Sequence, residues 1–309
     1  MRTKDLLSDV NFGAMLLERF VDHLTYEKRY SPHTVSAYHT DLQQFQAFLA
    51  SFGVSGLEAA TDRTVRAWMM QLMEQDIGAR SVNRKLSSLR GFYRFARLVG
   101  SVTIEPTALI DPPKTPKRLP EFVEEKGMER LMEDLEWPPG HRGATDRLVM
   151  DLLYSTGMRL AELIGLRISD ADLRGGSLRV LGKRQKERII PIGPDLVGEL
   201  KQYVVDRAVM GTVDPNGPLL ADEQGEPLAR RSVQRLVKHY LSGVTSQRKR
   251  SPHVLRHTFA THMLEHGADL NAVKELLGHA NLAATQVYTH NTVEKLRKVH
   301  ATAHPRGGQ

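Results

Sequence analysis

A proline-rich stretch sets the strongest limit on how this chain can fold. The segment "IEPTALIDPPKTPKRLP", residues 104–120, holds five prolines and three cations. Proline has no backbone N–H and disfavours helix in the residue before it, so the segment predicts an extended linker. The 309 residues also exceed the roughly 150 that serve as a guide for one domain. We therefore predict a domain at 1–103, a linker at 104–120 and a second domain at 121–309.

The residues before the linker have the spacing of consecutive helices. Apolar residues recur at helical intervals in 11–28, and three later segments each follow a start signal. Ser31 with Pro32 is typical of an N-cap and first turn, Thr61 is a second N-cap, and Ser81 is a candidate third. These patterns predict a small four-helix domain.

The second domain is predicted to be mostly helical with a small antiparallel sheet. The stretch "SLRVLGKRQKERIIPIG" indicates two short strands around a polar turn. Helical patterns cover the segments "EFVEEKGMERLMEDLE" and "GATDRLVMDLLYSTGMRLAELIGL", and then residues 194–210, 229–243, 252–266, 269–277, 281–288 and 292–303. The whole chain is thus expected to be mainly α.

Charge and composition narrow the class of partner. The 43 Lys and Arg against 36 Asp and Glu give a net charge of +7, which favours a polyanion such as nucleic acid. With no cysteine, disulfides and thiolate metal sites are excluded. No apolar run approaches the roughly 20 residues of a membrane span, and the start "MRTKDLLSDV" does not resemble a secretory signal. We expect a cytoplasmic protein without membrane insertion.

A run of cations lies on one predicted helix of the first domain. The segment "VNRKLSSLRGFYRFARLVG" places Arg84, Lys85, Arg90, Arg94 and Arg97 on its polar face. A solvated helix face and a DNA-binding face explain this pattern equally well, and we take the first four as candidate DNA-binding residues.

The stretch "SPHVLRHTFATHMLEHG", residues 251–267, carries the clearest candidate for chemistry. Ser251 and Pro252 suit the N-cap and first position of a helix, so His253 and Arg256 lie on one face near its positive end. Side chains and unsatisfied backbone N–H groups there together predict an anion site.

The remaining histidines of this helix fit packing or surface positions better. His262 and His266 have the i, i+4 spacing that zinc sites use, but the sequence lacks H-E-x-x-H. A metal site is therefore the weaker interpretation, and we predict no metal and no cofactor.

Four further residues indicate a function only when they are considered as a set. Arg159 follows a glycine turn in "STGMRLAEL", Lys183 lies in the predicted strand turn, and His279 and Tyr288 lie in "LLGHANLAATQVYTH". Each alone has an ordinary structural explanation. With His253 and Arg256 they form an ordered set within "TGMRLAELIGL", "GKRQKERIIPI" and "SPHVLRHTFATHML" that resembles the tyrosine recombinase (phage integrase) family.

The resemblance runs over nearly the whole chain. The opening "TYEKRYSPHTVSAYHTDLQQFQAFL" is similar to the core-binding domain of the Xer branch, and "PKRLPEF" and the terminal "HPR" resemble its XerC group slightly more than XerD. The implied fold is a SAM-like helical domain followed by a catalytic domain of the DNA breaking–rejoining type. Met158 and the pair Ala283–Ala284 differ from the usual sequence motifs of the family but replace no catalytic side chain.

The resemblance also implies a site and a reaction. Its catalytic set falls on Arg159, Lys183, His253, Arg256, His279 and Tyr288. Tyr288 would attack a DNA phosphodiester to form a 3′-phosphotyrosyl link, and the arginines would stabilise the charge of the transition state. His253 would accept the phenol proton, Lys183 would protonate the leaving 5′-oxygen, and His279 would hydrogen-bond the phosphate. Such an exchange of phosphoesters needs neither metal nor ATP.

The implied partners are double-stranded DNA and further recombinase protomers. The tetramer would contain a second Xer-type recombinase or copies of this chain, and a septum-associated DNA translocase is a further candidate partner. The last amphipathic segment, with Val293, Leu296 and Val299 on one side, would pack on its own domain or, as the resemblance favours, on a neighbouring protomer.

The main hypothesis is conversion of chromosome dimers to monomers at cell division. Three other functions remain open from the sequence. An integrase of a phage or mobile element, or a type IB topoisomerase, would use the same chemistry. A non-catalytic architectural DNA-binding protein would bind DNA but form no adduct.

Overall fold

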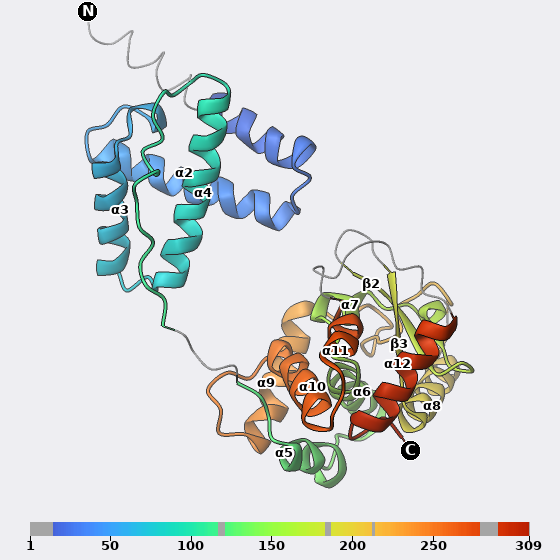
Figure 1. Cartoon of the computed structure of the whole chain (residues 1–309). Coiled ribbons are helices and arrows are strands. Elements are labelled where there is room, and N and C mark those ends of the chain that lie inside the picture. The colour runs from blue at the N-terminus through green and yellow to red at the C-terminus, as the bar shows by residue number, and fades with distance from the viewer. Residues whose placement is uncertain (1–14, 117–120, 183–186, 212–213, 279–289, 309) are drawn as a thin grey trace, which may run out of the picture. The chain divides into compact units, whose positions relative to one another are not determined.

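The computed structural model describes residues 15–116, 121–182, 187–211, 214–278 and 290–308. The chain forms two compact units, Met1–Arg118 and Leu119–Gln309. Within the described residues the structure is mainly helical with one small antiparallel sheet, so the predicted fold class is confirmed (Figure 1). None of the described helices has both the length and the apolar character needed to cross a bilayer.

The first unit is a bundle of four helical segments over the part that the structure describes. Its core centres on Phe45, Trp68 and Phe92, which are all at most 3% exposed. The four helical segments are 15–22 continuing into a π-helical turn His23–Glu27, α2 (Pro32–Ser51), α3 (Asp62–Glu74) and α4 (Ala79–Leu98). A short 3-10 turn, Leu57–Ala59, lies between α2 and α3 in the sequence.

Two of the three predicted helix starts in this unit are confirmed. The Ser31 hydroxyl accepts a hydrogen bond from the Thr34 N–H, and Thr61 and Thr64 form a reciprocal capping box. The third is wrong, because α4 already begins at Ala79, with Gly78 as the N-cap. The Gly78 carbonyl accepts the first bonds of that helix, from Ser81 and Val82.

Part of the proline-rich segment packs on the first unit. Ile110 is 2% exposed in its core. Arg66 donates to the Leu109 carbonyl at 2.8 Å, and Asn83 donates to the Pro113 carbonyl at 3.0 Å. In Figure 1 this strand-like stretch runs along α3 and α4. The absence of proline N–H donors keeps it out of a helix, so side chains of the bundle satisfy its carbonyls instead.

The second unit is built around α6, which is buried over most of its length. Residues 148–156 are all buried, and the helix packs on α8 and α10. Its helices are α5 (Glu125–Glu129) with a π-helical turn Arg130–Asp134, α6 (Gly140–Thr156), α7 (Leu160–Gly165), a 3-10 turn Ile168–Asp170, α8 (Pro194–Met210), α9 (Arg230–Val244), α10 (Pro252–Glu265), α11 (Leu270–Leu277) and α12 (His290–Ala303).

The described part of the sheet has three antiparallel strands in the order β1 (Ala171–Asp172), β2 (Ser177–Leu181) and β3 (Glu187–Pro191). The two predicted strands are β2 and β3, whose register pairs Leu178 with Ile190 and Val180 with Arg188. Alternation along β3 turns Arg188 and Ile190 to the buried side, so the strand carries a charged residue into the interior.

The last helix packs on its own unit in this structure. Leu296 is 2% exposed, the His300 ring lies 2.7 Å from the Ser155 carbonyl, and Arg306 donates to Asp151 at 2.7 Å. In this single chain the helix packs on its own domain, and its docking on a neighbouring protomer stays a prediction. Val293 lies among residues whose side chains are outside the described part.

Candidate active site

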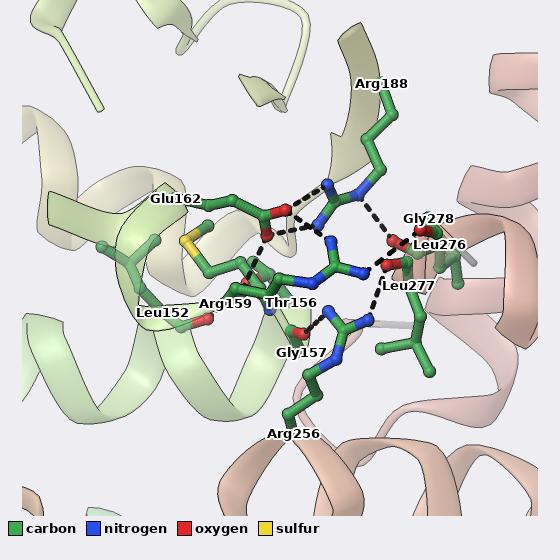
Figure 2. A network of polar contacts seen from close by, with 11 residues as sticks. Leu152, Thr156, Gly157, Arg159, Glu162, Arg188, Arg256, Leu276, Leu277 and Gly278 are labelled. Carbon is green, nitrogen blue, oxygen red and sulfur yellow. Dashed lines mark hydrogen bonds and ion pairs between the residues drawn. The ribbon is translucent and has the colours of Figure 1, made fainter. Parts of the chain in front are cut away.

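Two of the predicted catalytic residues converge although 97 positions separate them in the sequence. Arg159 is the N-cap of α7, and Arg256 lies in α10 after Ser251, Pro252 and His253. Figure 2 shows both guanidinium groups pointing toward the C-terminal end of α11. Together they form a cationic site between three helices.

The turn before Arg159 requires glycine. Gly157 ends α6 with φ +58, and a Cβ there would come within 2.5 Å of Phe259 and 2.8 Å of Leu277. The left-handed backbone lets the chain reverse direction between α6 and α7 in very little space. The Gly157 carbonyl then accepts a 2.7 Å hydrogen bond from Arg256 Nη1, so the same turn positions both arginines.

A buried carboxylate holds Arg159. Glu162 Oε2 accepts from the Arg159 backbone N–H and Oε1 from Arg159 Nη1, both at 2.7 Å. Burial by itself would raise the pKa of Glu162. The hydrogen bonds and positive charge of Arg188, together with the hydrogen bonds of Arg159, lower that pKa to about 2. Glu162 is therefore an anion at neutral pH and fixes the orientation of Arg159.

The end of α11 binds three guanidinium groups. The carbonyls of Leu276, Leu277 and Gly278 accept hydrogen bonds from Arg188 Nε at 2.9 Å, Arg256 Nη2 at 2.7 Å and Arg159 Nη2 at 3.3 Å, respectively (Figure 2). The last carbonyls of a helix have no partner within the helix and carry partial negative charge. They consequently attract three cations to one point.

The electrostatics of this point favour an anionic ligand. Burial, and next the positive charge of Arg159, lower the pKa of Arg256 to about 10, which still leaves it charged at neutral pH. The side chain of Arg159 is 35% exposed, so it is accessible from solvent. Two arginines held side by side present planar sets of donors that match a phosphate.

The other predicted catalytic residues are placed differently. His253 is exposed in the first turn of α10, one turn before Arg256. Ser251 occupies the predicted N-cap, although its side chain makes no capping hydrogen bond. Lys183, His279 and Tyr288 lie outside the described residues. Gly278, which directly precedes His279 in the chain, does belong to the site.

His262 of α10 behaves as a packing residue. His262 is fully buried, and its ring lies 2.9 Å from the Tyr154 hydroxyl. Burial lowers the pKa of His262, so the ring favours the neutral form. In the parts of the chain that the structure describes, no three His, Asp or Glu side chains gather as metal ligands would.

The predicted DNA-binding residues of α4 fall into two groups. Lys85 is 7% exposed and donates to Asp41 at 3.0 Å, so its expected place on the polar face is wrong. It turns inward because the buried Asp41 of α2 needs a cationic partner. Arg84 also pairs with Asp41 but remains 46% exposed, and Arg94 is exposed.

A surface pocket of about 450 Å³ lies next to these cations. Its lining includes Arg90 and Arg94 of α4 together with Lys28, Tyr30 and Tyr38. Arg90 also donates to the Ile110 carbonyl, and so helps to hold the proline-rich stretch. Cations interleaved with tyrosines are typical of surfaces that bind nucleic acid.

Sequence reasoning missed two members of the site, Glu162 and Arg188. A signal was present for each: Glu162 stands three residues after an N-cap in "RLAEL", and Arg188 falls on the inward phase of a strand in "KERIIPI". Their pairing joins positions 26 apart in the sequence, which the local pattern does not indicate.

Comparison with known families matches both units. The model of the phage integrase family matches residues 121–295, and that of the phage integrase N-terminal SAM-like domain matches residues 17–100.

Curated relatives of the Xer group cover nearly the full length. Tyrosine recombinase XerC of Pelobacter propionicus is 43% identical over 286 residues, which is 92% of this chain and 93% of that protein. Tyrosine recombinase XerD of Pseudomonas aeruginosa is 39% identical over 301 residues, covering 94% and 98%. Relatives with both names match well, so the comparison does not separate the two groups.

A solved structure shares the fold. The XerH site-specific recombinase bound to palindromic difH substrate, in a post-cleavage complex, superposes with a TM-score of 0.70 at 20% identity, covering 96% of this chain and 87% of that chain. At this identity the likeness concerns the fold alone.

Proposed function

The chain belongs to the phage integrase family, in the Xer branch of the tyrosine recombinases, and from that premise we propose how it exchanges DNA strands at a specific site. The observation that supports the proposal best is the convergence of Arg159 and Arg256 at the end of α11. A phosphodiester is anionic and repels nucleophiles, so a pair of fixed guanidinium groups is what its attack needs.

Tyr288 is the proposed nucleophile. Its phenolic oxygen bonds to phosphorus while the bond from phosphorus to the 5′-oxygen breaks, which leaves a 3′-phosphotyrosyl link and a 5′-hydroxyl. A phenol with an ordinary pKa near 10 is mostly protonated at neutral pH, so His253 accepts its proton. Lys183 donates a proton to the leaving oxygen, and His279 hydrogen-bonds the phosphate.

The reaction keeps its bond energy in the protein–DNA link. One phosphoester replaces another, and attack by a 5′-hydroxyl of a second strand reverses the step and reseals the DNA. Arg159 and Arg256 supply the positive charge at phosphorus, and both stay protonated at neutral pH. Neither ATP nor a cofactor enters this scheme.

The first unit, which contains the predicted domain 1–103, supplies affinity for the duplex. Arg84 and Arg94 are two of the exposed cations of α4, and Arg90 lines the adjoining pocket. Contacts to phosphates give salt-dependent affinity and set the register of the protein on the DNA. The protein would act in the cytoplasm, as a tetramer with a second Xer-type recombinase or with its own copies, to convert chromosome dimers to monomers at cell division.

A nicked substrate tests the chemistry. In a duplex nicked close to the cleavage site, cleavage releases the short fragment that carries the new 5′-hydroxyl, and its loss prevents resealing. The covalent complex is then trapped, and denaturing gel electrophoresis detects it. The wild-type chain and Tyr26→Phe, a matched change at a tyrosine 74% exposed, should form the adduct, and Tyr288→Phe should not. Persistence of the adduct in Tyr288→Phe would overturn the assignment of the nucleophile.

Mapping these adducts across a genome tests the biological role. Adducts at one site near the replication terminus support chromosome resolution. Adducts within mobile elements would instead support an integrase, and adducts scattered along DNA with no recombinant product would support a topoisomerase.

A further inference from the structure

Arg188 is a buried charged residue that the proposed chemistry does not use. It is 4% exposed on the inward side of β3, next in phase to the fully buried Ile190. Removing a cation from water is costly unless hydrogen bonds and an opposite charge compensate it. A buried arginine in a strand therefore needs an explanation from its partners.

Those partners are Glu162 and the end of α11, which also hold Arg159. Arg188 Nη1 and Nη2 donate to Glu162 Oε1 and Oε2 at 2.9 and 2.8 Å, and Nε donates to the Leu276 carbonyl at 2.9 Å. The same two carboxylate oxygens accept from Arg159, which in turn donates to Gly278, two residues after Leu276. Figure 2 shows Arg188 approaching this group from the side opposite Arg256.

We propose that Arg188 is a positioning residue for the cleavage reaction, an inference that rests on the function proposed above. By binding Glu162 and the end of α11 at once, it fixes the distance between α7, which begins after Arg159, and the carbonyls that hold Arg256. It sets the geometry of the two catalytic arginines without touching the DNA.

Two features of the chain around Arg188 agree with this role. A Cβ on Gly278 would come within 3.1 Å of Arg188 Cδ, so the turn that ends α11 fits directly against the arginine. In the sequence β3 begins four residues after Lys183, so Arg188 also anchors the strand that leads away from the predicted proton donor.

The chemistry of the side chain matters as well as its charge. The guanidinium is a planar group that binds a carboxylate with two parallel bonds and a carbonyl with a third. Lysine at this position would keep the charge but could not reproduce that geometry.

The test compares Arg188→Lys and Arg188→Met with changes at a neighbouring arginine of the same sheet. Arg179 of β2 also binds a carboxylate, with Nε and Nη2 at 3.3 and 3.1 Å from Asp170 Oδ1, but it is 52% exposed. In the full-length protein at saturating nicked DNA, Arg188→Met should slow Tyr288 adduct formation about 10²-fold, as expected for a misplaced catalytic group. Arg188→Lys should be intermediate, and Arg179→Lys and Arg179→Met should stay close to wild type because exposed pairs contribute little.

A second substrate separates positioning from loss of folded protein. A methylphosphonate at the cleavage site is uncharged, so attack on it depends less on the arginines. The ratio of rates on phosphate and methylphosphonate should therefore fall in the Arg188 variants, and this ratio does not depend on the folded fraction. An unchanged ratio, or a wild-type rate in Arg188→Met, would overturn this role alone. Absence of any Tyr288 adduct in the wild-type chain would overturn the proposed function and this role with it.

Discussion

Each unit contains a buried carboxylate that binds two cations, yet the two clusters differ in what lies next to them. In the first unit Asp41, 1% exposed, accepts hydrogen bonds from Arg84, Lys85 and Ser88. In the second unit Glu162, 7% exposed, accepts hydrogen bonds from Arg159 and Arg188. The local electrostatics are alike, so a charged cluster alone does not identify a site.

The two clusters differ in the elements that supply the cations and in the other groups that these cations bind. All three partners of Asp41 lie on α4, so this cluster fastens α4 to α2. The partners of Glu162 come from two elements and go on to the end of α11, where Arg256 arrives from α10. A cluster that brings cations from separate elements to one accessible point can bind an anion, whereas a cluster within one helix pair stabilises the fold.

The largest expected effect separates the two clusters by rate. Arg256→Gln removes a proposed donor to the reacting phosphate and should lower Tyr288 adduct formation about 10³-fold at saturating DNA. Arg84→Gln, the matched change at the Asp41 cluster, should leave that rate near wild type. Single-turnover trapping on nicked DNA measures the rate for both variants. An equal loss of rate in the two would show that the two clusters do not differ in their contribution to cleavage.

The next effect concerns stability, where the two clusters should behave alike. Asp41→Asn and Glu162→Gln each leave buried cations without their anion, at a cost of about 3 kcal/mol. The chain has two tryptophans, Trp68 in the first unit and Trp137 in the second, so fluorescence of Trp137→Phe and Trp68→Phe backgrounds reports each unit separately during urea unfolding. Each substitution should shift only the transition of its own unit.

A smaller effect follows from the pKa of Glu162, which is about 2 against an ordinary 4.5. A carboxyl with a depressed pKa stabilises the folded state above its unfolded pKa, and that stabilisation is lost as pH falls toward the folded pKa. The urea midpoint of the second unit should therefore drop between about pH 5 and pH 2. Glu162→Gln should flatten this dependence, and an equally steep decline in that variant would contradict the assignment.

The smallest effect distinguishes exposed from buried cations of α4. Arg94→Gln should reduce the slope of log affinity against log salt by about one, as the loss of one phosphate contact does. Lys85→Met should leave the slope unchanged, because Lys85 is 7% exposed and binds Asp41. Equilibrium binding to a short duplex at several salt concentrations measures both slopes.

Much of the fold follows from local sequence patterns. Ser31–Pro32 and Thr61 start helices because their side chains satisfy backbone N–H groups within three residues, and the β2–β3 pair follows from alternation around a polar turn. Ser81 is not an N-cap, because α4 already begins at Ala79 and the N–H of Ser81 donates to the Gly78 carbonyl within its first turn. The two residues of β1 are too short to show any periodicity.

The site was less accessible to sequence reasoning. Arg159 and Arg256 could be named from motifs, but their convergence depends on how α7, α10 and α11 pack. Lys85 looked like a surface cation because its partner Asp41 lies 44 positions away. Arg188 and Glu162 depend in the same way on a contact between elements, and such contacts are set by tertiary packing.

The end of α11 couples the positions of three arginines in the second unit. Three consecutive carbonyls at the end of this helix each accept a hydrogen bond from a different arginine, so the three guanidinium groups depend on the position of one helix. Because packed interiors shift between discrete arrangements and do not deform continuously, a displacement of α11 would unseat all three together. We therefore expect the three arginines to be brought into position, or displaced, together.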